Sequence, residues 1–97
     1  MGRVQGDTMQ AIPFTVHIFR EGEMYVAHAP ELDVSSCGGT EAEARRNIRG
    51  AVKGFLETSG DMGTLSDVLE ESGYRLEDGE WRAPQFVALD HLSVGVG

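Results

Sequence analysis

The spacing of the apolar residues changes near Thr40, and this change limits most strongly what the chain can fold into. Over residues 12–19 apolar side chains alternate with others, which predicts a strand with one face turned to a core. Beyond Thr40 they recur every three or four positions, which predicts an amphipathic helix. The helical stripe comprises Ala44, Ile48, Ala51, Val52, Phe55 and Leu56. A short chain with both periods is expected to be an α+β domain.

Turn signals place two more strands before the helix. Residues 20–23 form a short turn, and residues 24–29 return as the second strand of a hairpin. Pro30 ends this strand because proline has no amide hydrogen to donate to a β-ladder. A third strand over residues 33–37 then leads into the helix. We therefore predict three consecutive strands in a mostly antiparallel sheet.

The segment after the long helix holds a second helix, a small hairpin and a last strand. The long helix should stop near Gly60, and a shorter one should cover residues 64–73, with the threonine at its start as N-cap. A tight hairpin around residues 78–79 carries Trp81 as its apolar anchor. Residues 85–96 alternate again, which predicts a final strand. The predicted order is β-β-β-α-α-β, with a small C-terminal hairpin before the last strand.

Chain length and composition indicate a single folded unit. The 97 residues allow one domain, which we place at residues 11–97, after a flexible tail over residues 1–10 that lacks periodicity. No apolar run reaches the roughly 18–20 residues that span a bilayer, and the N-terminus does not resemble a secretory signal. The single cysteine cannot form an internal disulfide. These features predict a cytoplasmic protein with no membrane contact.

The charge balance bears on the partners of the protein. Its 16 acidic and 8 basic residues give a net charge of −8. A protein that binds nucleic acid normally presents a basic face to the phosphates, so we expect no direct nucleic-acid binding. An acidic protein instead attracts basic partners, because complementary potentials steer association. The alternative interpretation is that the acidity only keeps the protein soluble.

Residues 35–47, SSCGGTEAEARRN, combine the cysteine with a glycine pair and two glutamates. A phosphate-binding loop of the Walker type requires a lysine that this segment lacks, and the glutamates would repel phosphate. Thr40 and Glu43 instead match the S/T-x-x-E capping box, in which the hydroxyl accepts from the amide of Glu43 and the carboxylate from the amide of Thr40. Gly38 and Gly39 let the chain turn without a Cβ clash. The segment therefore predicts a capped helix start.

No set of residues in the sequence predicts catalysis, a cofactor or a metal ion. Cys37 has no sequence neighbour that could act as a general base, so we expect a small buried side chain and a protein that is not an enzyme. His17 and His28 lie diagonally on one face if the first hairpin has a two-residue loop at residues 21–22, and on opposite faces if the loop has three. Neither these histidines nor His91 have the spacing of a metal site.

A second stripe on the long helix is a candidate contact face. Glu43, Asn47, Gly50 and Gly54 lie together beside the apolar stripe. A glycine inside a helix costs about 1 kcal/mol relative to alanine. One hypothesis is that Asn47, Gly50 and Gly54 let another backbone or ring approach closely. The alternative is a helix that is merely imperfect.

The order of these elements and their motifs resembles the HicB-like antitoxin family. In that family an extended P-x-L follows the second strand, and a G-x-T-x-x-E-A segment opens the helix. The matching residues are Pro30, Glu31, Leu32, Gly38, Thr40, Glu43 and Ala44. The resemblance implies a partial ribonuclease-H-like fold without the metal-binding acids of that fold. It also implies dimers or tetramers that bind and block a small basic mRNA-cleaving toxin, HicA.

The segment after the long helix departs from the family pattern. Antitoxins of this type usually carry a C-terminal helix-turn-helix or ribbon-helix-helix that binds their operator. Here the sequence offers a short helix, a hairpin and a strand, with no run of Lys or Arg. We therefore predict a non-catalytic HicB-like binding module without an operator-binding domain. Two alternatives stay open: a homo-oligomeric domain of unassigned role, and a small metal-dependent hydrolase or nuclease.

Overall fold

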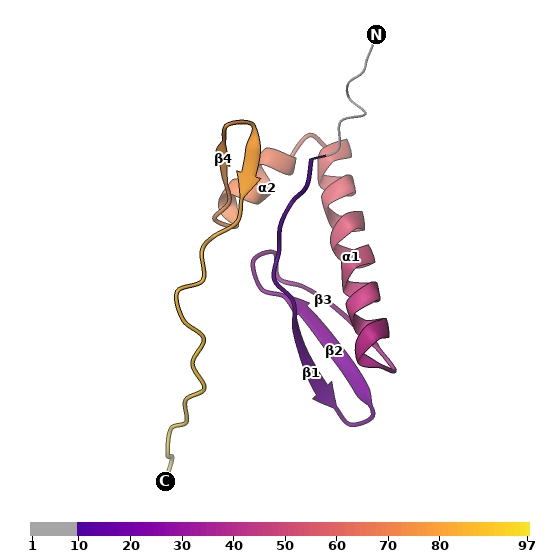
Figure 1. The fold of residues 1–97 in the computed structure, drawn as a ribbon, viewed down its shortest axis with the longest axis vertical. Helices are drawn as coiled ribbons and strands as arrows, with labels where there is room; N and C mark the ends of the chain where they lie inside the picture. The colour runs from indigo at the N-terminus through magenta and orange to yellow at the C-terminus, as the bar shows by residue number, and fades with distance from the viewer. Residues whose placement is uncertain (1–9) are drawn as a thin grey trace.

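Three antiparallel strands form the main sheet of the protein (Figure 1). In the computed structural model, which describes residues 10–97, β1 spans His17–Glu21, β2 spans Met24–Ala29 and β3 spans Val34–Gly38. The strand order is β1-β2-β3, and both pairings are antiparallel. The α+β class and the antiparallel sheet predicted from the sequence are therefore confirmed.

The first strand is shorter than its alternation predicts. Residues 12–16 have no ladder partner, and β1 begins only at His17. Continuing the register of β1 and β2 would place Thr15 opposite Pro30, which has no amide hydrogen to donate. The ladder therefore stops where the proline stops β2. Residues 1–9 of the predicted flexible tail lie outside the described residues.

The first hairpin turns at residues 22–23, one position later than the two-residue loop considered above. As a result, His17 lies directly opposite His28. The diagonal arrangement expected from a loop at residues 21–22 is wrong, although both histidines do share one face. Moving the loop by one residue shifts every pairing by two, and this keeps each side chain on its face. Gly22, with a φ of 61°, supplies the left-handed conformation of the turn.

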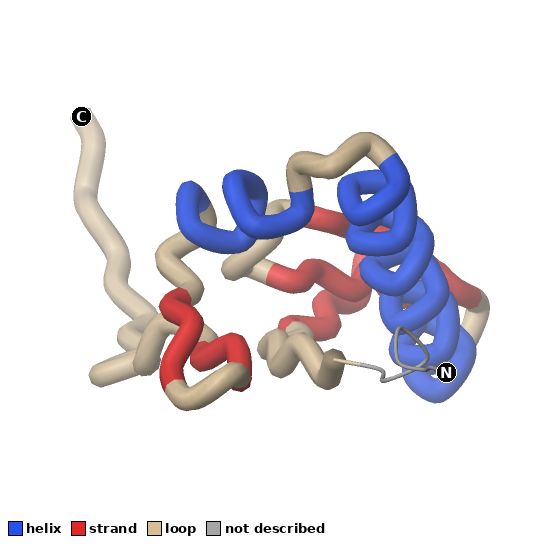
Figure 2. The backbone as a smooth tube through the Cα atoms, turned by 90° about the horizontal axis from the view of Figure 1, so that it is seen from above, coloured by secondary structure: helices blue, strands red, loops and turns tan. Residues whose placement is uncertain are grey.

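Helix α1, Glu41–Asp61, covers one face of the main sheet (Figure 2). It ends one residue past Gly60, close to the predicted stop. Ala27 and Ala29 alternate along β2 and are both fully buried, so this face of the sheet is turned toward α1. Among residues 10–97 the buried apolar core consists of Ala27, Ala29, Leu32, Ala44, Ile48, Val52, Leu69, Tyr74 and Trp81.

A second helix and a small hairpin extend the core beyond the end of α1. Helix α2 spans Leu65–Glu71, and the hairpin consists of β4, Arg75–Glu77, and β5, Glu80–Arg82. Residues 78–79 form its turn, both with positive φ, as a type I′ hairpin turn requires. Trp81 is 6% exposed and anchors the hairpin to the core, as predicted.

Thr64 precedes α2 but does not cap it, contrary to the prediction. Its side chain makes no capping hydrogen bond to α2. The amide of Thr64 donates to the carbonyl oxygen of Ser59 at 2.9 Å, and its hydroxyl donates to the same oxygen at 3.3 Å. The short connection between the helices thus uses Thr64 to satisfy a free carbonyl at the end of α1.

The final strand predicted over residues 85–96 does not form. Residues 83–97 have no regular secondary structure. Ala83 still packs against the core, whereas the later residues run away from the helices and sheets (Figures 1 and 2). Val87 is 94% exposed and Leu89 is 84% exposed, and His91 is also exposed. A strand needs a neighbour for its backbone amides and carbonyls, and no strand within residues 10–97 pairs with this segment. We refer to residues 83–97 as the C-terminal segment.

Candidate functional site

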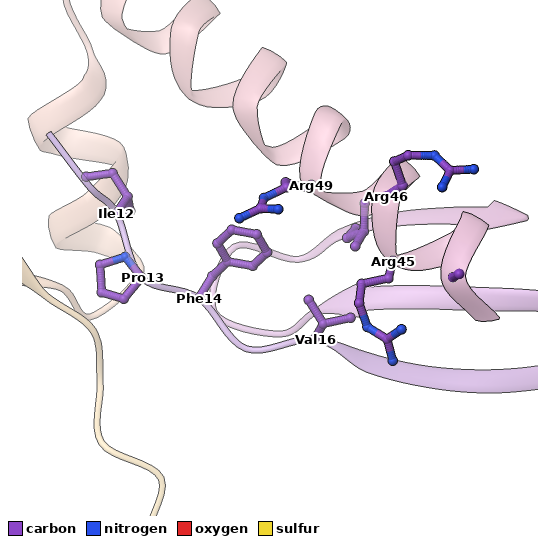
Figure 3. Close-up of a pocket in the computed structure, with 9 residues that line it drawn as sticks. Ile12, Pro13, Phe14, Val16, Arg45, Arg46 and Arg49 are labelled. Carbon is purple, nitrogen blue, oxygen red and sulfur yellow. The ribbon is translucent and has the colours of Figure 1, made fainter. Parts of the chain in front are cut away.

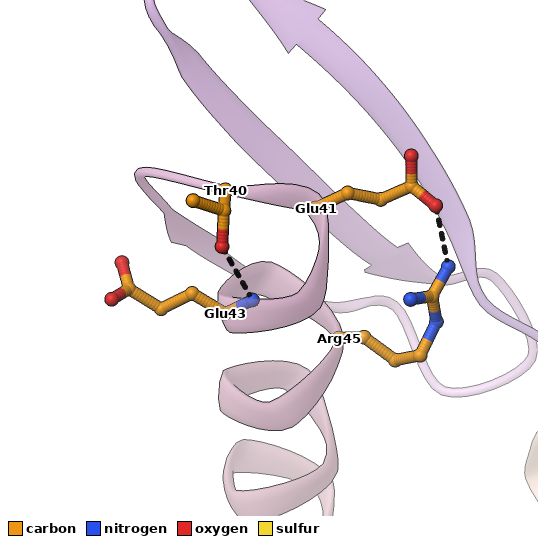
Figure 4. Close-up of polar contacts among 4 residues, drawn as sticks. All are labelled: Thr40, Glu41, Glu43 and Arg45. Carbon is orange, nitrogen blue, oxygen red and sulfur yellow. Dashed lines mark hydrogen bonds and ion pairs between the residues drawn. The ribbon is translucent and has the colours of Figure 1, made fainter.

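The helix start predicted from the capping box forms, with one difference in its hydrogen bonds (Figure 4). The Thr40 hydroxyl accepts from the amide of Glu43 at 3.0 Å, as predicted. The Glu43 carboxylate, however, accepts from the amide of Gly39 at 2.6 Å, one residue before the predicted donor. Arg45 and Glu41 form the ion pair of the first turn, with 2.9 Å between guanidinium nitrogen and carboxylate oxygen. The motif therefore stabilises both the connection between β3 and α1 and the first turn of α1.

Gly38 marks the closest approach between β3 and α1. A Cβ atom built on Gly38 would lie 2.6 Å from the amide nitrogen of Ala44, a distance that real Cβ atoms do not reach. Ala44 is itself fully buried. Packing therefore requires glycine at this position, because any side chain there would push α1 away from the sheet.

Glu31 holds the extended residues 12–16 in place. Its carboxylate oxygens accept from the amide of Thr15 at 3.0 and 3.1 Å and from the Thr15 hydroxyl at 2.7 Å. These bonds compensate for the ladder that Pro30 interrupts. The neighbouring Leu32, 8% exposed, enters the core. The P-E-L motif therefore connects the second strand to the segment that precedes the first.

Tyr74 secures the same segment from the other end of the chain. Its hydroxyl donates to the carbonyl oxygen of Pro13 at 2.5 Å, and the side chain is 2% exposed. Burial, with a smaller contribution from the negative charge of Glu31, raises the pKa of Tyr74 to about 12. The folded protein therefore holds this phenol in its neutral, donating form.

Cys37 is exposed, which corrects the expectation of a buried side chain. Strand alternation explains the difference: Cys37 pairs with Val26 and points to the side of the sheet that α1 does not cover. Its backbone carbonyl accepts from the side-chain amide of Asn47 at 2.8 Å. The thiol thus belongs to a second, uncovered surface.

We call this second side of the main sheet the helix-free face. The strand registers assign to it His17, Phe19, Glu21, Met24, Val26, His28, Ser35 and Cys37. Phe19, Val26 and Cys37 stand directly opposite one another across the three strands and form one apolar row. Phe19 is 49% exposed and Cys37 is also exposed, so the row is open to solvent at both ends.

The charges on the helix-free face are acidic. Glu21 lies on this face, and at its edge the Asp33 carboxylate accepts from the His28 ring, with 2.9 Å between Oδ1 and Nε2. Arg20, the basic residue within the three strands, faces the other way and lies over the ring of Tyr25, 5.8 Å from its centroid. The face therefore combines an apolar row with negative charge.

No other element among residues 10–97 packs against the two glycines of the predicted contact stripe on α1. A Cβ atom built on Gly50 or Gly54 would find no neighbouring atom within 4 Å. Asn47 is exposed, and its side-chain amide donates to the backbone carbonyl of Cys37. Nothing in the described chain approaches the two glycines, and contact by another chain stays a prediction.

The described residues also bear on metal and membrane binding. No three His, Cys, Asp or Glu side chains among residues 10–97 are grouped to hold a metal ion. Neither described helix combines the length and the apolar character needed to cross a bilayer.

Comparison of the chain with protein-family models, with curated protein sequences and with solved structures finds no match. The resemblance to HicB-like antitoxins therefore rests on the motif residues and on the order of the elements. The motif residues connect β2, β3 and α1.

The apolar row was missed in the sequence, although one signal was available. Phe19 is the large apolar residue on the side of the first strand that otherwise holds Pro13, Thr15 and His17. The alternation does not decide which of the two sides of this strand is buried. Val26 and Cys37 join Phe19 only through the register of the sheet, which the sequence left open.

Proposed function

We propose that the protein is a non-catalytic binding module that takes a basic protein partner on its helix-free face. The observation that carries this proposal is the row of Phe19, Val26 and Cys37, aligned across three strands and not covered by α1. Apolar side chains gathered on an open surface and rimmed by polar ones are typical of protein-interaction sites. Met24, 43% exposed, widens the same surface.

The charges on the face indicate what kind of partner fits. Glu21 and Asp33 border the apolar row, and the whole chain carries a net charge of −8. A partner with an apolar centre and a rim of Lys or Arg would match both properties. Long-range attraction between the two proteins would also speed their encounter.

The particular role that we propose is that of a cytoplasmic HicB-like antitoxin. The motif residues from Pro30 to Ala44 and the β-β-β-α order of the described chain support this proposal. In that role the module binds a small basic mRNA-cleaving toxin and covers the surface with which the toxin holds RNA. A partial ribonuclease-H-like fold belongs to the same proposal.

The test uses a small basic protein encoded beside this one. The two proteins should co-purify after co-expression, and the partner's mRNA cleavage should be suppressed in the complex. Phe19→Glu should weaken binding by about tenfold or more, because it removes the largest apolar side chain of the row and places a charge there. Met62→Glu, at an exposed residue beyond the end of α1, is the matched control and should bind as the unaltered protein does.

Added salt provides a second measurement, since it should weaken an association that depends on opposite charges. Equal binding by Phe19→Glu and the unaltered protein would remove the helix-free face as the site. If no small basic protein encoded nearby binds the module, the antitoxin role is wrong.

A further inference from the structure

A groove lies between the extended residues 12–16 and helix α1, with a volume of about 650 Å³ (Figure 3). Apolar side chains and guanidinium groups share its lining. The residues that matter for its chemistry are Phe14, Val16, Ile48, Arg45, Arg46 and Arg49. Since β1 is an edge strand of the main sheet, the groove lies beside an edge of the sheet, on the side that α1 covers.

Two of the three arginines have no acidic partner in the described chain. Arg45 is paired with Glu41. No carboxylate among residues 10–97 lies within 4.0 Å of the charged nitrogens of Arg46 or Arg49. The groove therefore offers an apolar floor and two unpaired positive charges, although the protein as a whole is acidic. An extended apolar segment that carries a carboxylate would complement it.

The C-terminal segment has that composition. In an extended chain the even-numbered side chains share one face. They are Phe86, Ala88, Asp90, Leu92, Val94 and Val96. Leu92 and Val94 are each 85% exposed, and Val96 is 91% exposed. Asp90 thus stands in the middle of an otherwise apolar face, which is open to solvent from Leu92 onward.

The segment of the same chain does not reach the groove. The ring of Phe86 lies 6.4 Å from that of His17, which belongs to the helix-free face, and the chain then runs away from the helices and sheets (Figures 1 and 2). None of the residues that line the groove belongs to the C-terminal segment. The C-terminal segment of a second copy can reach the groove, because its path does not start from the same chain. If two copies exchange this segment about a twofold axis, they form a closed dimer.

We propose that residues 86–96 of a second copy occupy the groove. Their apolar face packs against Phe14 and Val16, and Asp90 lies between Arg46 and Arg49. The incoming segment adds a strand at the β1 side of the sheet, which protects an edge that is otherwise open. Each copy supplies one segment and one groove. This dimer uses a surface other than the helix-free face, so it does not depend on the basic partner proposed above.

Light scattering and sedimentation of the full chain test the proposal. The unaltered protein should be a dimer at micromolar concentration. Asp90→Arg should raise the dimer dissociation constant by about tenfold or more, because like charges would then meet in the groove. Combining it with Arg46→Asp and Arg49→Asp should restore the dimer. Asp67→Arg makes the same charge change at an exposed residue of α2 and should leave the dimer unchanged.

Two outcomes would overturn the proposal. One is a monomer at micromolar concentration, and the other is a dimer that Asp90→Arg does not weaken. In a monomer, protection of the C-terminal amides from hydrogen exchange would show that the segment covers its own chain. Since Asp90 is exposed and lies outside the helices and sheets, its substitution should leave the circular dichroism of the protein unchanged. Binding of a basic partner by a monomer would contradict the dimer and leave the proposed function intact.

Discussion

Residues 12–18 and residues 86–96 carry the same alternation of apolar side chains but lie in different surroundings. In the first segment Ile12, Phe14, Val16 and Ile18 are partly buried against the core, and Glu31 and Tyr74 hold its backbone. In the second segment the apolar side chains stay exposed. Alternation therefore indicates which face of a segment can be buried, and the presence of a covering element decides whether it is.

The largest change in the free energy of unfolding is expected where residues 12–18 pack against α1. Ile48 of α1 is fully buried and lines the groove beside Phe14. Ile48→Ala should lower the free energy of unfolding by about 2–5 kcal/mol, because it removes apolar contacts and leaves a cavity. Leu89→Ala, in the exposed segment, should change it by less than about 0.5 kcal/mol. Urea denaturation in dilute solution measures both, and an equal loss would show that the second segment is packed within its own chain.

A smaller effect is expected from the carboxylate that holds the first segment. Glu31→Ala leaves the amide and hydroxyl of Thr15 without their acceptor, so the free energy of unfolding should fall by about 1–3 kcal/mol. The amide of Thr15 should also exchange its hydrogen faster. Glu23→Ala, in the exposed turn after β1, is the control. Unchanged exchange at Thr15 would mean that the segment is held by packing alone.

Alkaline pH should loosen the same segment through Tyr74. Its folded-state pKa is about 12, above the ordinary value of 10.0, because burial disfavours the phenolate. Between these values the unfolded chain has lost the proton that the folded chain keeps. The contribution of Tyr74 is therefore complete below pH 10.0 and is lost as pH rises toward about 12.

Tyr74→Phe should remove this part of the alkaline decline. At neutral pH it should cost about 1 kcal/mol, since the hydrogen bond to Pro13 is lost. Denaturation in urea over a series of alkaline pH values gives both quantities. The same alkaline slope in the variant would place the titrating group elsewhere.

The smallest change in the free energy of unfolding is expected from a substitution in α1, the helix that packs on residues 12–18 but not on residues 86–96. Gly54→Ala should raise the free energy of unfolding by about 1 kcal/mol, because a methyl group there meets no atom of the described chain and alanine favours the helix. If Gly54→Ala instead weakens self-association, the stripe of Asn47, Gly50 and Gly54 is a contact face.

The parts of the fold that were predictable depend on near neighbours in the chain. The Thr40 hydroxyl and the Glu43 amide meet within one turn, and residues 78–79 alone determine a hairpin turn. Pro30 ends β2 through its own missing hydrogen. The partner of the Glu43 carboxylate was misplaced by one residue, because several free amides lie within its reach at a helix start.

The sequence by itself determined the α+β class, the order of the strands and helices up to β5, and the capped start of α1. Only the tertiary structure decided that His17 faces His28, that Cys37 is exposed, and that Phe19 joins an open apolar row. The same holds for residues 85–96, whose alternation predicted a strand that no neighbour completes. Local hydrogen bonds and periodicity act within a few residues, whereas register and cover depend on segments far apart in the chain.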